Sequence, residues 1–231
     1  AYQVSPAGYS IGGMAKGAGM LAPGLATMLV VITTDAELSS QELDAALRAS
    51  TRMSFDRLDS DGCMSTNDQV TLMASGASGV RPHLAEFTKN LQAVCLDLAK
   101  QLQHDAEGSS HDITITVSGA ASEADAEEVG RSVARNNLFK AAIYGNDPNW
   151  GRILAAVGVT KAEFDPYNID VSINGISVSK HGQPDQPREL VDLTPRAVEI
   201  LINLNSGAHV AEIYTNDLTH EYVEENSAYS S

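Results

Sequence analysis

The chain has 231 residues, of which 43% are hydrophobic and 19% are charged, so it can form one large domain or two small ones with a substantial core. Its 15 basic residues stand against 30 acidic ones, which gives a net charge of -15. A surface this acidic repels phosphate backbones and anionic lipid headgroups, so binding to nucleic acid or to a membrane is not expected.

The sequence is typical of a cytoplasmic protein. Two cysteines, Cys63 and Cys95, are too few for a disulfide framework and fit a reducing compartment. No apolar run approaches the roughly 20 residues that a membrane-spanning helix needs. The stretch that ends at Ala26 resembles a signal peptide, but its strong apolar run, Met28 to Ile32, follows the apparent cleavage site instead of preceding it. The chain opens on Ala1 and not on Met, so we expect its natural sequence to continue upstream.

The first elements in chain order are a strand, a loop, a second strand and a helix. Tyr9 to Lys16 predicts a strand, and Gly17 to Gly24 predicts a loop rich in glycine. Thr27 to Thr34 is apolar and β-branched, as expected of a strand that is buried on both faces. A pair of serines then caps a helix over Glu42 to Ser50.

Strands and helices alternate through the middle of the chain. Val70 to Ala74 predicts a short strand, and the strict alternation of Asp112 to Ser118 predicts a longer one. Pro82 opens a helix to about His104, with apolar residues at helical spacing. Ser122 caps a helix to about Asn137, whose first turns are acidic, as the helix dipole favours. The polar joint Asp105 to His111 is the best candidate for a domain boundary.

The last third of the chain continues this alternation. Gly145 to Arg152 predicts a loop that enters another helix, and two short apolar runs around Asn174-Gly175 predict a hairpin. Pro195 is expected to start a helix to Leu204, Val210 to Thr215 a last strand, and Asp217 to Ser231 is a polar tail. The whole pattern indicates mixed layers of α-helix and β-sheet.

Thr27 is the position that points most directly to chemistry. It stands at the first position of a predicted buried strand, after a loop of glycine and proline, and this geometry suits an N-terminal nucleophile. Its hydroxyl would attack the carbonyl of Ala26, and water would resolve the ester. The freed α-amine, with an unperturbed pKa of about 7.7–8.0, can then act as the base for its own hydroxyl. By spacing alone, the same pattern also fits an ordinary threonine at the start of a strand.

Several stretches of this sequence together resemble one enzyme family. They are Met14 to Met20, Ala26 to Leu29, Ser65 to Asp68, Asp105 to Gly108, Gly145 to Arg152, and the closing Asn226 to Ser231. In this order, from about Tyr9 to Ser231, the chain resembles the bifunctional glutamate N-acetyltransferases, also called ornithine acetyltransferases.

The resemblance implies an α+β fold, an αββα sandwich like that of N-terminal-nucleophile hydrolases, with an additional α/β subdomain. It implies that the precursor cuts itself between Ala26 and Thr27 into α and β chains, which stay together as a heterotetramer of two α and two β chains. It also implies that acetyl moves from N-acetylornithine to glutamate, in arginine biosynthesis, by a ping-pong mechanism through acetyl-Thr27. No cofactor or metal is implied, although some members also take acetyl from acetyl-CoA.

The domain organisation follows from the same resemblance. Residues 1–26 would end the α chain, and residues 27–110 would belong to the sandwich core with the nucleophile strand. Residues 111–216 would form the α/β subdomain, and residues 217–231 would be a tail that returns to the active site.

The resemblance assigns roles to five residues of this chain. Thr27 is the nucleophile, and Lys16 binds the substrate, where a cation suits the carboxylate that both glutamate and N-acetylornithine carry. Glu107 contacts the substrate, and an acid there suits its ammonium group. Asn226 and Ser231 contact the substrate from the tail, and Ser231 keeps the hydroxyl that many relatives supply with a threonine. The oxyanion-hole pair of the family, a Thr-Gly dipeptide, lies upstream of this chain.

Two alternatives belong to other functional classes. The chain could be part of a self-cleaving aminopeptidase or amidohydrolase of the same broad fold, in which water resolves the acyl-enzyme instead of an amine. It could also be a structural fragment without catalysis, in which the bond before Thr27 stays intact.

Other motifs resemble known binding sites but lack a feature that those sites require. Gly17 to Ala22 fits a dinucleotide-binding pattern, but Pro23 and Gly24 forbid the helix that must follow. Asp59 to Asp68 resembles a calcium loop, but a cation, Arg57, would occupy its first ligand position. The six histidines show no metal-type pairing. Trp150 and Arg152 are expected to pack or stack at a helix start, without a catalytic role.

Overall fold

The computed structural model describes residues 1–22, 28–64 and 67–228, and the chain divides into two compact units. The first unit comprises Ala1–Leu58 and Cys63–Asp105. The second comprises Asp59–Gly62 and the chain from Ala106 onward. Each unit has one sheet of parallel and antiparallel strands with helices packed on it, so the fold class is α+β, as the sequence predicted.

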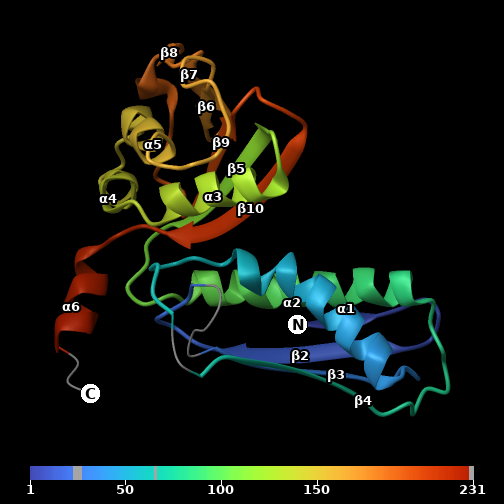
Figure 1. Cartoon of the computed structure of the whole chain (residues 1–231). Helices are drawn as coiled ribbons and strands as arrows, with labels where there is room; N and C mark the ends of the chain where they lie inside the picture. Colours follow the sequence, from blue (N-terminus) through green and yellow to red (C-terminus); the bar gives the residue numbers. More distant parts are fainter. Residues whose placement is uncertain (23–27, 65–66, 229–231) are drawn as a thin grey trace. The chain divides into compact units, whose positions relative to one another are not determined.

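The sheet of the first unit has four strands in the order β1-β2-β3-β4. They are β1 (Tyr2–Val4), β2 (Ser10–Lys16), β3 (Leu29–Thr34) and β4 (Gln69–Ala74). β2 runs antiparallel to β1 and β3, whereas β3 and β4 are parallel. The connection from β3 to β4 contains α1 (Ser40–Arg52) and the short 3-10 helix η1 (Phe55–Arg57), and α2 (Leu84–His104) follows β4. Figure 1 shows α1 and α2 on the same face of this sheet.

The helices of the first unit begin at side-chain caps. Ser39 caps α1 in a capping box: the Ser39 hydroxyl accepts from the Glu42 N–H at 3.3 Å, and the Ser39 N–H donates to Glu42 Oε2 at 2.8 Å. The imidazole of His83 caps α2 by accepting from the Ala85 N–H at 3.3 Å. The predicted helices are confirmed, although α2 begins at Leu84, two residues after Pro82, because the cap is His83.

β3 is buried on one face only, which corrects the prediction of a strand buried on both faces. Val30 and Ile32 are 1% and 0% exposed, whereas Leu29 and Val31 are 43% and 42% exposed. The reason is that α1 and α2 cover one face of the sheet, so the strand alternates between buried and exposed residues. The open face of this sheet carries large apolar side chains on three neighbouring strands: Met14, Leu29, Val31 and Met73.

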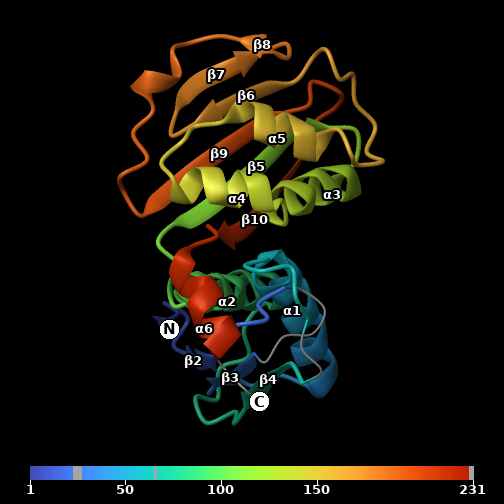
Figure 2. The same cartoon turned by 90° about the vertical axis from the view of Figure 1, so that its left-hand side faces the viewer.

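The sheet of the second unit has six strands in the order β10-β5-β9-β6-β7-β8. They are β5 (Asp112–Ala120), β6 (Asp170–Ile173), β7 (Ile176–Lys180), β8 (Gln183–Pro184), β9 (Ala197–Asn203) and β10 (His209–Asn216). β5 and β9 are parallel, and the other neighbours are antiparallel. Three helices, α3 (Glu123–Ala134), α4 (Asn137–Tyr144) and α5 (Trp150–Val157), lie across one face of this sheet (Figure 2).

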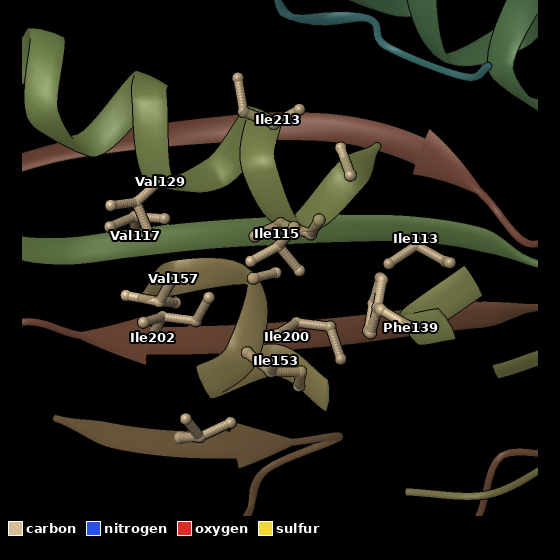
Figure 3. Close-up of a cluster of buried hydrophobic side chains, with 14 of the residues drawn as sticks. Ile113, Ile115, Val117, Val129, Phe139, Ile153, Val157, Ile200, Ile202 and Ile213 are labelled. Atoms are coloured by element: carbon tan, nitrogen blue, oxygen red, sulfur yellow. The ribbon is translucent and has the colours of Figure 1, made fainter. Parts of the chain in front are cut away.

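The core of the second unit lies between this sheet and these helices (Figure 3). β5 and β9 contribute every second residue, because successive side chains of a strand point to opposite faces. The central members, each at most 1% exposed, are Ile113, Ile115, Val117, Ile200 and Ile202 from the strands, and Val129, Phe139, Ile153 and Val157 from the helices. Burial of an isoleucine-sized side chain stabilises the fold by roughly 1.5–3 kcal/mol.

The helix that the sequence predicted from Pro195 to Leu204 is wrong, because residues 197–203 form the strand β9. Val198, Ile200 and Ile202 are buried, while Glu199 and Leu201 between them are exposed. Strict alternation over seven residues is the pattern of a half-covered strand. A proline before a run of β-branched residues is therefore a weak helix signal here.

The helix predicted to about Asn137 ends earlier than expected, at Ala134, and a second helix, α4, follows it. The side chain of Asn136 accepts from the Phe139 N–H at 3.0 Å and so begins α4. This helix was not predicted, because its cap lies inside an apparently continuous helical pattern.

The hairpin at Asn174-Gly175 and the last strand are confirmed. Asn174 and Gly175 have φ values of 47° and 79°, as the two central residues of a type I′ turn require. The tail is more ordered than a polar composition suggests, because His220–Ala228 forms the helix α6. Within the described residues, no helix is both long and apolar enough to span a bilayer.

We predict that Ile200→Ala lowers the free energy of unfolding by about 2–5 kcal/mol, because it opens a cavity beneath the helices. The neighbouring residue of Ile200 provides the control. Glu199→Ala, on the exposed side of the same strand, should change the free energy of unfolding by about 0.5 kcal/mol or less. Urea unfolding midpoints measure both effects, and equal losses would contradict the alternation of β9.

The two cysteines should react very differently with an alkylating agent. Burial within α2 raises the pKa of the Cys95 thiol to about 12, whereas Cys63 is exposed. Since the thiolate is the nucleophile, the native protein should take up one iodoacetamide label, on Cys63, and the urea-unfolded protein two. Mass spectrometry of the labelled peptides tests this, and rapid labelling of Cys95 in the native protein would contradict the buried position.

Candidate functional site

Lys16 lies on the strand next to the one that Thr27 precedes. Lys16 is the last residue of β2, its side chain is exposed, and the antiparallel register pairs it with Leu29 at the start of β3. Thr27 and Ala26, the predicted nucleophile and cleavage partner, lie outside the described residues, so the described chain resumes at Met28. The register therefore sets Lys16 across from a residue two positions after Thr27.

Asp68 fixes the backbone immediately after Thr27. Its carboxylate Oδ1 accepts a hydrogen bond from the Met28 N–H at 2.9 Å, and the next residue, Gln69, donates its N–H to the Met28 carbonyl at 3.0 Å. Burial raises the pKa of the Asp68 carboxyl above its ordinary value, against the opposing effect of the Met28 hydrogen bond. The motifs of the sequence assign Asp68 no role of its own, and the one available signal was its place just before the predicted strand Val70 to Ala74.

A cavity of about 400 Å³ adjoins both described ends of the segment that contains the predicted cleavage site. Leu21 and Ala22 precede that segment, Met28 follows it, and all three line the cavity together with Asp68. Apolar side chains of α1, of η1 and the residue after it, and of β4 complete much of the wall: Leu47, Phe55, Leu58 and Val70. The first unit thus offers a partly apolar space beside the residues that flank the segment with the predicted nucleophile.

The second unit brings two of the predicted substrate residues into contact. Asn226 Nδ2 donates to Glu107 Oε2 at 3.2 Å, although the two residues are 119 positions apart in the chain. Both line a cavity of about 450 Å³, with Glu225 and Ala228. Glu107 also lines a smaller polar cavity of about 100 Å³, where the buried Lys140 and Tyr222 are neighbours. Ser231, the other tail residue, lies outside the described residues.

Asp59, in the stretch that resembles a calcium loop, is a buried acid that pairs with two partly exposed arginines. Its side chain is 0% exposed, and its Oδ2 lies 2.8 Å from Arg135 Nε and 3.4 Å from Arg131 Nη1. Burial raises the pKa of the Asp59 carboxyl, and the two guanidinium groups oppose that shift. Among the described residues, no cluster of His, Cys, Asp or Glu could hold a metal ion.

The remaining motifs have structural roles. Residues 17–22 of the dinucleotide look-alike form no helix, as expected. Asn149 caps α5, Trp150 packs against the core of the second unit, and Arg152 donates to the Leu138 carbonyl at 2.6 Å. These contacts account for Trp150 and Arg152 without chemistry.

Comparison with known proteins places this geometry in one family. The model of the ArgJ family matches residues 1–231. An arginine biosynthesis bifunctional protein ArgJ of Streptomyces avermitilis is 61% identical over 228 residues, and the match covers 99% of this chain and 60% of that protein. The protein of the same name from Bifidobacterium longum is 52% identical, over 97% of this chain and 58% of its own length. The chain thus spans about 60% of the length of these relatives.

A solved structure agrees with the sequence matches. The crystal structure of the arginine biosynthesis bifunctional protein argJ from Bacillus halodurans superposes with a TM-score of 0.81 at 37% identity. The match covers 87% of this chain and 98% of the solved chain, so the solved chain is the shorter of the two. With a family model over its whole length and a close structural relative, this chain belongs to the ArgJ family.

Proposed function

We propose that this chain is the C-terminal part of an acetyltransferase of arginine biosynthesis, which moves an acetyl group from N-acetylornithine to glutamate. The names of its relatives, arginine biosynthesis bifunctional proteins, support the pathway. Since the chain spans about 60% of those relatives, the proposal concerns the whole protein. This chain would supply the nucleophile and much of the substrate site.

The contact between Glu107 and Asn226 carries the proposal. The resemblance assigns both residues to the substrate, one from the middle of the chain and one from its tail. Their side chains meet at 3.2 Å beside a shared cavity, as two contacts of one ligand should. A carboxylate and an amide together can accept from a substrate ammonium group and donate to a neutral or anionic oxygen.

Maturation would be self-cleavage before Thr27. The Thr27 hydroxyl oxygen attacks the Ala26 carbonyl carbon, the carbon–nitrogen bond breaks, and the departing nitrogen takes the hydroxyl proton. Water hydrolyses the ester, which leaves a carboxylate on Ala26 and a free amine on Thr27. The hydrogen bond from the Met28 N–H to the Asp68 carboxylate supports this step, because it fixes the backbone one residue after Thr27. The shorter solved chain also supports it, since a β chain beginning at Thr27 would be shorter by a similar amount.

Transfer would then proceed in two halves. The Thr27 amine takes the proton of its own hydroxyl, whose oxygen attacks the acetyl carbonyl of N-acetylornithine, and ornithine leaves with that proton. The amine of glutamate attacks the resulting acetyl-Thr27, and the hydroxyl is restored. Lys16 would bind the substrate carboxylate, and Glu107, Asn226 and Ser231 would hold its polar groups. No bound cofactor is needed, and acetyl-CoA would enter as an alternative donor of acetyl.

The remainder of the site would come from upstream. The oxyanion-hole pair implied by the resemblance is not in this chain, and one such donor is worth about 2.7–4 kcal/mol of barrier. The open apolar face of Met14, Leu29, Val31 and Met73 supports a missing layer as well, because an exposed patch of this kind marks a packing surface. We infer that an upstream sheet covers this face to complete the αββα sandwich, and that two α and two β chains assemble.

Replacement of the nucleophile tests the proposed function. Thr27→Ala in the full-length protein should stop cleavage, seen as one uncut chain by intact mass, and lower acetyl transfer by more than about 10³-fold. Thr27→Ser, which keeps a hydroxyl, is the matched control and should be cut and retain transfer. Peptide mass after exposure to N-acetylornithine should show one acetyl on Thr27.

Three outcomes would contradict this scheme. Cleavage and transfer that survive in Thr27→Ala would exclude Thr27 as the nucleophile. Release of acetate at the same rate with and without glutamate would indicate the hydrolase alternative. An intact Ala26–Thr27 bond in the wild-type protein would support the structural alternative.

A second test concerns the charge of Glu107. Glu107→Gln keeps the size of the side chain and its contact with Asn226, but it removes the partner for a substrate ammonium group. We expect KM for N-acetylornithine to rise about tenfold, equivalent to roughly 1.4 kcal/mol. Glu224→Gln, an exposed acid on α6, has the same charge change and should leave KM within about twofold. Equal effects of the two variants would show that only the net charge matters.

A further inference from the structure

We infer that Asp217 is a positioning residue for the substrate site, because its carboxylate ties the C-terminal tail to the loop that carries Glu107. The loop is residues 106–111, at the start of the main stretch of the second unit, and the described part of the tail is residues 217–228. The inference rests on the proposed function, which assigns Glu107 and Asn226 to the substrate.

Asp217 is buried, and its carboxylate accepts only from the loop among the contacts described. Its side chain is 0% exposed, and Oδ1 accepts from the backbone N–H groups of Ser110 at 2.9 Å and His111 at 3.0 Å. Oδ2 lies 2.7 Å from His111 Nδ1 and also accepts from the Ser110 hydroxyl. Hydrogen bonds to a carboxylate are stronger than those between neutral groups, so the Asp217 side chain joins the start of the tail strongly to the loop.

The imidazole of His111 is itself fixed by the rest of the second unit. Its Nε2 lies 3.0 Å from the carbonyl oxygen of Leu193, so both ring nitrogens of His111 make polar contacts within the second unit. His111 therefore links Asp217 to the segment that leads into β9. The start of the tail cannot shift without breaking this chain of buried polar contacts.

A second tie follows two residues later. The Thr219 hydroxyl donates to the Gly108 carbonyl at 2.6 Å and accepts from the Tyr222 N–H at 2.9 Å, as an N-cap of α6 does. Gly108 has a φ of 58°, and a Cβ on it would lie 2.3 Å from the Tyr222 backbone nitrogen. Only glycine permits this approach of the loop to the tail.

These ties set the position of Asn226 relative to Glu107. Asn226 lies one turn after Tyr222 on α6, whose start follows the end of β10 (Figure 1). Its Nδ2 donates to the Tyr222 carbonyl at 2.9 Å and to Glu107 Oε2 at 3.2 Å. α6 has nine residues and none of them is buried, so it lacks the apolar face that normally holds a helix. Its place therefore depends on the polar contacts that Asp217 makes before the helix and Thr219 makes at its start.

The experiment uses Asp217→Asn in the full-length protein. The asparagine keeps the size of the side chain but lacks the charge of the carboxylate. Its amide nitrogen would also face one of the donors of Ser110 and His111, where the carboxylate has an acceptor oxygen. We expect KM for N-acetylornithine to rise about tenfold while kcat changes by less than about threefold, because substrate binding is lost and the nucleophile is intact. Intact mass should show normal cleavage before Thr27.

Two comparisons separate positioning from general destabilisation. Ile173→Ala, in β6 and three strands away from β10, empties a buried position and supplies the matched control with a lowered Tm but an unchanged KM. In the Glu107→Gln background, Asp217→Asn should add less than about twofold to KM, because both changes act on the same contact. The inference is overturned if the effects of Glu107→Gln and Asp217→Asn on KM multiply in the double variant. It is also overturned if Ile173→Ala raises KM as much as Asp217→Asn does at the same loss of Tm.

Hydrogen exchange gives a readout that does not need activity. Amides of residues 220–228 should exchange faster in Asp217→Asn than in the wild type, and should not in Ile173→Ala. Unchanged exchange would overturn the inference, whatever the kinetics show. If the wild-type protein transfers no acetyl, the proposed function fails by itself, and the exchange result still decides whether Asp217 holds the tail.

Discussion

Each sheet of this protein is covered by helices on one face, and this constraint decides which residues of its strands are buried. In the first unit α1 and α2 bury Val30 and Ile32 and leave Leu29 and Val31 exposed. In the second unit α3, α4 and α5 bury the alternate residues of β5 and β9. Strands buried in this way are rigid, so the segments at their ends are held at defined positions. Lys16, Met28 and Asp217 all stand at or beside such strand ends.

Polar contacts position the candidate residues within each unit. The Met28 N–H is held by Asp68, and the tail is held by Asp217 and Thr219. Buried polar groups must be paired, so each of these contacts restricts the backbone to few arrangements. The substrates proposed above carry both carboxylate and ammonium groups, and a site can match their geometry only if its own charged groups are held in place.

The sequence predicted most elements correctly where a local signal was unambiguous. The serine cap and Glu42 located α1, the alternation of Asp112 to Ser118 located β5, and Asn174-Gly175 located the hairpin. It failed where two local patterns competed. Residues 197–203 satisfy a helix start after Pro195 and also strand alternation, and pairing with β5 and β6 decided for the strand. Asn136 is a cap that the surrounding helical pattern concealed.

The sequence by itself determined the family, through short motifs whose order is specific, and with it the residues to which chemistry can be assigned. Tertiary structure alone decided that Glu107 and Asn226 meet, that the Asp68 carboxylate accepts from the Met28 N–H, and that Asp59 is a buried acid paired with Arg135. The physical reason is that these contacts join residues far apart in the chain. Local propensity acts over a few residues, whereas the partner of a buried polar group is set by how sheets and helices pack.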